Sequence, residues 1–197
     1  MAVLESAGPL MDLNQCLSLP AELPIEVESV DTASAHLISS QLANLLREAF
    51  AGPPGPWTYF TDNRPGVGIL STIEELTAVE ASVALEPGGA TIAGHVHHVR
   101  ASLAGSTELV IKKRASRDRT GTWTVSQVSD AEWKQQQTML RAQYEISLQT
   151  IQSRMDWDED GLGAAAGAVA HAAYHLGAIR QRLRLGSYAA RETPSQG

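Results

Sequence analysis

The chain of 197 residues carries 15 Lys and Arg against 22 Asp and Glu, a formal net charge of -7. An acidic chain of this kind repels phosphate backbones, so the charge argues against nucleic-acid binding. The length suits one domain that can bury a sizeable core.

Cysteine content and the lack of long apolar runs predict a soluble cytoplasmic protein. Cys16 is the single cysteine, so the chain cannot form an internal disulfide or a cysteine-rich zinc site. The first residues lack the basic and continuous apolar regions of a signal peptide, and no run approaches the roughly 20 apolar residues that span a bilayer. We therefore expect no membrane partner.

Proline, glycine and polar residues mark the expected domain boundaries. Residues 1–30 contain three prolines and are expected to form an irregular N-terminal arm. Residues 187–197 are polar and are expected to form a flexible C-terminal tail. The folded domain is therefore predicted to cover residues 31–186.

The first part of this domain contains one long and one short predicted helix. Apolar residues recur at helical spacing over residues 32–50, behind Asp31 as the N-cap, and the segment AGPPGP ends this helix. Ser71 and Glu74 have the spacing of a capping box, which predicts a short helix from there to about Val83.

Three more long helices are predicted in the rest of the domain. The first covers residues 91–113, where apolar residues form one stripe. Ser129 and Glu132 form a second capping-box pattern and open a helix that runs to about Ile151. The last covers residues 161–185. Strand signals are scarce, so the fold class is predicted to be all-α.

The segment at residues 115–128 has no helical period and joins the second and third long helices. Fourteen residues at about 3.3 Å each reach roughly 45 Å, whereas a helix of twenty residues is about 30 Å long. The two helices can therefore lie parallel. We expect a four-helix bundle with a long crossover between helices two and three.

Five of the six histidines fall in two clusters, one with His95, His97 and His98 and the other with His171 and His175. Two histidines four residues apart lie on one helix face and can bind one ion, although a core or surface pair has the same spacing. Small residues surround His171, and the other cluster offers a third ligand. Three histidines with an open position form a common catalytic zinc site.

Three segments, TIAGHVHHVRASL, VSDAEW and AHAAYHLGAIRQ, resemble the DinB-like (DinB/YfiT-like) superfamily of bacterial proteins in content, order and spacing. The resemblance covers residues 31–184. It implies a four-helix bundle with a long crossover, often a homodimer, that binds a divalent metal ion such as zinc or nickel. Matching the motifs places the metal ligands at His98, His171 and His175.

Helical geometry leaves an alternative ligand open in the second long helix. At about 100° per residue, the apolar stripe of this helix lies closer to His95 than to His98. We follow the motif and keep His95 as the alternative. His97 is expected at the surface, and His36 is expected to be structural or exposed.

A site with three neutral imidazoles leaves the charge of the ion unneutralised, so a bound water or thiol becomes more acidic. Some relatives in the resembled family transfer low-molecular-weight thiols, such as mycothiol or bacillithiol, onto electrophiles. The resemblance therefore implies a metal-dependent thiol S-transferase or hydrolase with a small-molecule substrate. The alternative is a non-catalytic, metal-stabilised bundle with a structural, stress-response or partner-binding role.

The sequence assigns no catalytic residue. Tyr174 lies between two predicted ligands and offers either a hydroxyl near the site or a packing surface. Glu80 and Asp62 are candidates by charge alone. The four tryptophans are expected to anchor loops and helix starts, and Trp123 is expected to cap the crossover or lie in a dimer interface.

Overall fold

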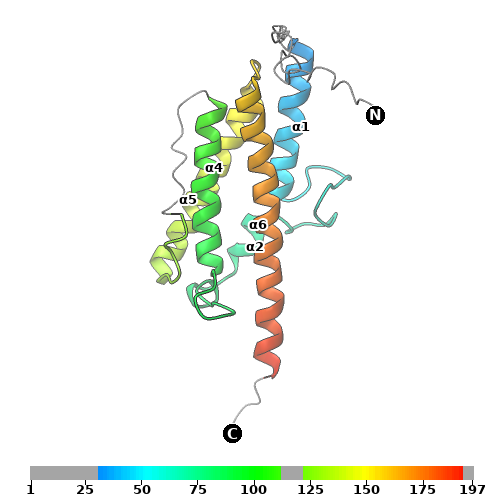
Figure 1. The fold of residues 1–197 in the computed structure, drawn as a ribbon. Coiled ribbons are helices and arrows are strands. Elements are labelled where there is room, and N and C mark those ends of the chain that lie inside the picture. Colours follow the sequence, from blue (N-terminus) through cyan, green and yellow to red (C-terminus); the bar gives the residue numbers. More distant parts are fainter. Residues whose placement is uncertain (1–30, 112–121, 193–197) are drawn as a thin grey trace, which may run out of the picture.

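The computed structural model describes residues 31–111 and 122–192, and these residues form six helices and no strand (Figure 1). This result confirms the all-α fold class. The expected arm at 1–30 with Cys16, the first half of the expected crossover (residues 115–121), and residues 193–197 lie outside the described residues. The helices are α1 (Thr32–Phe50), α2 (Ile69–Glu74), α3 (Ala78–Ala81), α4 (Ile92–Val110), α5 (Asp130–Ser153) and α6 (Glu159–Glu192).

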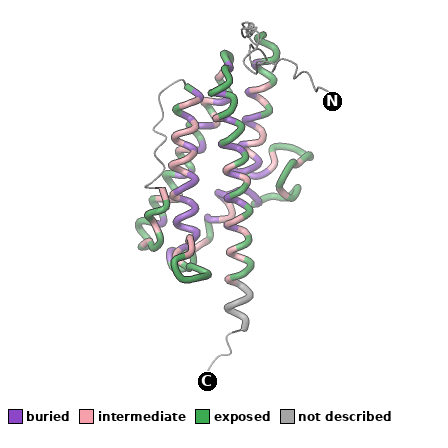
Figure 2. The backbone as a smooth tube through the Cα atoms, in the orientation of Figure 1, coloured by how far each residue is buried: buried purple, intermediate pink, exposed green. Residues whose placement is uncertain are grey.

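The four long helices pack around one core. Helix α4 contacts α5 and α6, and α1 contacts the same two helices from the other side. In Figure 1, α4 and α5 run in one direction, while α1 and α6 run in the opposite direction. Buried positions concentrate along α4 and where the long helices face one another (Figure 2). The most buried side chains of this core include Leu46, Phe50, Val96, Val99, Leu140 and Ile179.

Two of the predicted helix starts are confirmed by their caps. The Asp31 carboxylate accepts hydrogen bonds from the backbone N–H groups of Ala33 and Ser34 at 2.9 and 3.1 Å. At the start of α5, Ser129 and Glu132 form the predicted capping box, in which the Ser129 N–H donates to Glu132 Oε2 at 2.7 Å. Both caps use residues close in sequence, which explains why the pattern predicts them.

The predicted capping box at Ser71 and Glu74 is wrong. Helix α2 begins at Ile69 behind Gly68, with no side-chain cap, and it already ends at Glu74. Its start is set by burial, because Ile69, Leu70 and Ile73 all lie in the core. A separate helix, α3, follows and has its own capping box.

Helix α6 is longer than predicted, because it continues to Glu192 and so enters the expected tail. Its C-terminal part extends beyond the ends of the other helices (Figure 1). Residues Glu159–Gly186 are long and apolar enough to cross a membrane by length and composition alone. A core helix of a soluble protein passes the same test, so this is weak evidence for a membrane span.

Two tryptophans anchor neighbouring segments, as predicted. The Trp133 indole N–H donates to the Leu76 carbonyl oxygen at 2.6 Å, and the Trp157 indole N–H donates to Ser39 Oγ at 2.9 Å. These bonds fix the segment before α3 against α5 and the start of α6 against α1. Trp57 is 85% exposed and does not anchor a buried segment.

A buried carboxylate at the end of α1 holds the loop that follows. Glu48 is 2% exposed and accepts hydrogen bonds from the backbone N–H groups of Tyr59, Phe60 and Thr61 at 2.8–3.0 Å. Burial acts to raise the pKa of Glu48, but these hydrogen bonds outweigh it and hold the pKa below its ordinary value of 4.5. The ionised carboxylate therefore stabilises the folded loop.

We expect Glu48→Gln to lower the free energy of unfolding by about 2–4 kcal/mol, because an amide NH₂ group would face backbone donors. Denaturant unfolding at pH 7 measures this difference. The folded pKa is lower than the unfolded value, so the wild type keeps this stability above about pH 4.5 and loses it as the pH falls through the folded pKa. Glu145→Gln, at an exposed position of α5, is the matched control. Equal stability of the two variants at pH 7 would contradict the role of Glu48.

Candidate metal centre

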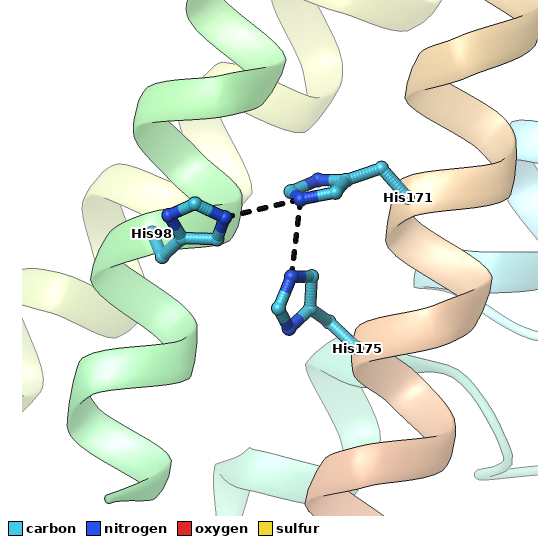
Figure 3. A group of neighbouring side chains, drawn as sticks. All are labelled: His98, His171 and His175. Atoms are coloured by element: carbon cyan, nitrogen blue, oxygen red, sulfur yellow. Dashed lines mark hydrogen bonds between the residues drawn. The ribbon is translucent and has the colours of Figure 1, made fainter. Parts of the chain in front are cut away.

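The structure brings His98 on α4 together with His171 and His175 on α6 (Figure 3). The Nε2 atom of His171 lies 3.1 Å from Nε2 of His98 and 3.1 Å from Nε2 of His175. His98 and His175 are 7% and 2% exposed, and His171 is half-buried. These are the three residues that the motifs predict as metal ligands, and the group could hold a metal ion.

The spacing of the three nitrogens fits a small divalent cation. Zinc binds imidazole nitrogen at about 2.0–2.1 Å, which at a tetrahedral angle places two ligand nitrogens about 3.3 Å apart. The two observed separations of 3.1 Å are close to this value. His171 Nε2 lies close to both of the other ring nitrogens. A proton on His171 Nε2 can form a good hydrogen bond with only one of them, whereas a cation can bind all three nitrogens. Among the described residues, the group contains three histidines and no carboxylate or thiol.

The far side of the His98 ring is held by the segment that precedes α5. His98 Nδ1 lies 2.8 Å from Thr122 Oγ1, which can accept a hydrogen bond from Nδ1–H, so that the lone pair of Nε2 is available to an ion. The Trp123 ring stacks on the His98 ring, with centroids 4.2 Å apart and an interplanar angle of 19°. Trp123 is 46% exposed, so its indole covers one side of the histidine group.

His95, the alternative ligand, lies behind the group and is not part of it. It is 5% exposed, and its Nδ1 atom lies 2.8 Å from Nδ1 of His175. Arg182 Nε donates a hydrogen bond to the other nitrogen, His95 Nε2, at 3.2 Å. The apolar stripe thus correctly indicates that His95 is buried, but burial places it next to His175 instead of beside His171.

Two of these imidazoles are held in the neutral form. Burial lowers the pKa of His95 to about 4, and the nearby charges of Arg182 and His98 add to this effect. Burial lowers the pKa of His175 to about 3, with further contributions from His171, His95 and His98. The neutral imidazole is the form that binds metal, so the surroundings favour coordination near neutral pH.

The other candidate residues do not join the group. Tyr174 is 69% exposed, and its ring meets the edge of His175 at a centroid distance of 4.9 Å. Glu80 accepts hydrogen bonds from Thr77 as the capping-box residue of α3, and Asp62 forms an exposed ion pair with Arg64. His36 is exposed, and His97 is only half-buried.

Sequence reasoning missed the contacts that surround the histidines: Thr122, the stacking of Trp123, and Arg182. One local signal could have indicated the first two. Gly94 lies inside a helix, where glycine is unfavourable, and a Cβ atom there would lie 2.8 Å from the Val125 carbonyl oxygen. Gly94 therefore lets the segment that carries Thr122 and Trp123 lie close against α4.

Comparison with known proteins gives no match. No protein-family model, curated protein or solved structure matches the chain. The function is therefore argued from the residues of the site and their geometry.

We expect Gly94→Ala to destabilise the protein by about 1–3 kcal/mol, because the added methyl group would clash with the Val125 carbonyl oxygen. The gain in helix propensity, about 1 kcal/mol, does not offset this clash. Gly105→Ala on the same helix is the control, since its Cβ atom would meet nothing within 4 Å. Thermal unfolding of both variants tests the close approach, and equal midpoints would contradict it.

Proposed function

We propose that the chain is a DinB-like, metal-dependent enzyme in which His98, His171 and His175 bind a zinc or nickel ion. The observation that carries this proposal is the convergence of their three Nε2 atoms. The reaction class that fits is thiol S-transfer or hydrolysis on a small molecule. A cytoplasmic location and a homodimeric assembly complete the proposal and rest on the sequence and the resemblance alone.

The arrangement of the long helices supports the bundle with a long crossover that the resemblance implies. Helices α4 and α5 run in the same direction, so the chain between Val110 and Asp130 has to return along the length of a helix. Helices α1 and α6 run in the opposite direction, and α5 and α6 are each packed against both α1 and α4. The metal ligands would then come from the second and fourth long helices, as in the resembled family.

The chain's own residues would supply a rigid, partly covered site. The three imidazoles contribute no negative charge, so a bound ion would make a water or thiol at a free coordination position more acidic. Thr122 and His95 fix the ring orientations of His98 and His175. The Trp123 indole limits access of water from one side.

A non-catalytic role is the second candidate, because the histidine group bridges two helices. His98 lies on α4, whereas His171 and His175 lie on α6, so an ion would cross-link two helices of the core. A closed fourth position would favour this structural role. An open fourth position would favour catalysis.

We expect about one zinc or nickel ion per chain after metal is offered and excess is removed, as measured by plasma mass spectrometry. His98→Ala, His171→Ala and His175→Ala should each lose most of the bound metal, because each removes one of three ligands. His97→Ala is the matched control, since His97 lies beside His98 but outside the group. Metal retained by the three variants, or lost equally by His97→Ala, would contradict the assigned ligands.

The cobalt(II)-substituted protein tests whether the fourth position is open. We expect 2-mercaptoethanol to add a thiolate-to-cobalt absorption band in the near ultraviolet, because a thiolate would displace water from an open position. The band should be missing in cobalt-treated His171→Ala. A cobalt spectrum that does not change with thiol would favour the structural role over the thiol chemistry.

A further inference from the structure

A cavity of about 330 Å³ lies between α3 with the segment after it, the start of α4 and the C-terminal half of α6. Its lining is mostly apolar and includes Val83, Leu85, Ile92 and Leu183. Val83 and Leu85 are 48% and 39% exposed, whereas Ile92 is 3% exposed, so the cavity has open apolar walls and a buried apolar floor. Such a lining suits the apolar part of a small molecule.

Arg182 connects this cavity to the histidine group. It lines the cavity, and its Nε–H donates to His95 Nε2 at 3.2 Å. His95 in turn contacts His175 at 2.8 Å. The Nη1 atom of Arg182 is shielded from solvent and has no hydrogen-bond partner among the described residues. A buried guanidinium nitrogen without an acceptor is costly, so the present position of Arg182 leaves it incompletely satisfied.

The hydrogen bond from Arg182 fixes the proton positions on two neutral rings. Because His95 Nε2 accepts from Arg182, the proton of neutral His95 lies on Nδ1 and is donated to His175 Nδ1. The proton of neutral His175 must then lie on Nε2. That is the atom that faces His171, where a metal ion would bind.

For His175 to offer the lone pair of Nε2, its proton must lie on Nδ1. His175 then donates to His95 Nδ1, and the His95 proton lies on Nε2. Two N–H groups, one from His95 and one from Arg182, would face each other. No proton leaves the pair of rings in this change, but the hydrogen bond from Arg182 has to break. While His95 and His175 stay in contact, metal binding and the Arg182–His95 hydrogen bond exclude each other.

We propose that the cavity binds a small carboxylate with an apolar tail, and that metal binding releases Arg182 to hold the carboxylate. This inference rests on the proposed metal site and names the class of ligand that the site would take. A released guanidinium can bind a carboxylate through two parallel hydrogen bonds. The other charged lining residue, Glu80, is already bound to Thr77 N and Thr77 Oγ1 at 2.8 Å each and caps α3.

The two ligands should bind with positive coupling. Metal removes the hydrogen bond that holds Arg182 on His95, and the carboxylate stabilises the released guanidinium. We expect metal to raise carboxylate affinity about ten- to a hundredfold, the effect of one hydrogen bond to a charged group. By thermodynamic linkage, the carboxylate should raise metal affinity by the same factor.

Isothermal titration of octanoate into the apo and the zinc-loaded full chain tests this proposal, with bound zinc measured separately by plasma mass spectrometry. We expect octanoate to bind more tightly to the zinc-loaded protein, and octan-1-ol to bind weakly and equally to both forms. Equal octanoate affinity in the two forms would overturn the coupling. Normal zinc uptake without octanoate binding would overturn the cavity proposal alone, whereas failure of zinc uptake would overturn the proposed function.

The Arg182→Met variant distinguishes two ways of holding the octanoate carboxylate: by the Arg182 guanidinium or by the metal ion directly. We expect this variant to keep or slightly raise its zinc affinity and to lose the zinc-dependent gain in octanoate affinity. Arg184→Met removes the same charge from an exposed position of the same helix turn and should behave as wild type. Tight octanoate binding by zinc-loaded Arg182→Met would overturn the role of Arg182. Loss of zinc affinity in that variant would show a merely structural role.

Discussion

The close packing of α4 against α6 is the contact on which the histidine group depends. The buried residues of α6 near the histidines include three alanines, Ala165, Ala168 and Ala172. Small side chains let two helices approach closely, so imidazoles that project from both can meet at nitrogen-to-nitrogen distances of 3.1 Å. Larger residues at these positions would separate the helices and the ring nitrogens with them. The packing of α4 against α6 therefore also sets the distances between the ring nitrogens of the site.

Features that depend on local sequence could be predicted well, and features that depend on burial could not. Asp31 and Ser129 cap helices through contacts within three residues, so their patterns were sufficient. Ser71 and Glu74 have the same spacing, but the burial of Ile69 and Leu70 moves the helix start ahead of them. At Ser71 and Glu74, burial of the apolar residues ahead of the pattern therefore outweighs the capping spacing.

The candidate site shows the same limit. The four-residue spacing of His171 and His175 places them on one helix face in any arrangement of the bundle. A helical wheel gives the direction of a side chain but not the distance to the opposite helix, so it could not decide whether His95 or His98 faces His171. The contacts of Thr122, Trp123 and Arg182 depend on how distant segments pack together. Gly94 is the one sequence signal for the contacts of Thr122 and Trp123, and Arg182 has none.

The two buried rings of the group differ in how their far nitrogens are held. His98 Nδ1 faces the hydroxyl of Thr122, which can donate or accept, so this ring can present a free Nε2 without any other change. His175 Nδ1 faces His95, whose other nitrogen is fixed by a guanidinium that can only donate. One ring is therefore ready to bind an ion, and the other requires a rearrangement that extends to Arg182. If an ion binds, this asymmetry would couple it to Arg182, which also lines the cavity.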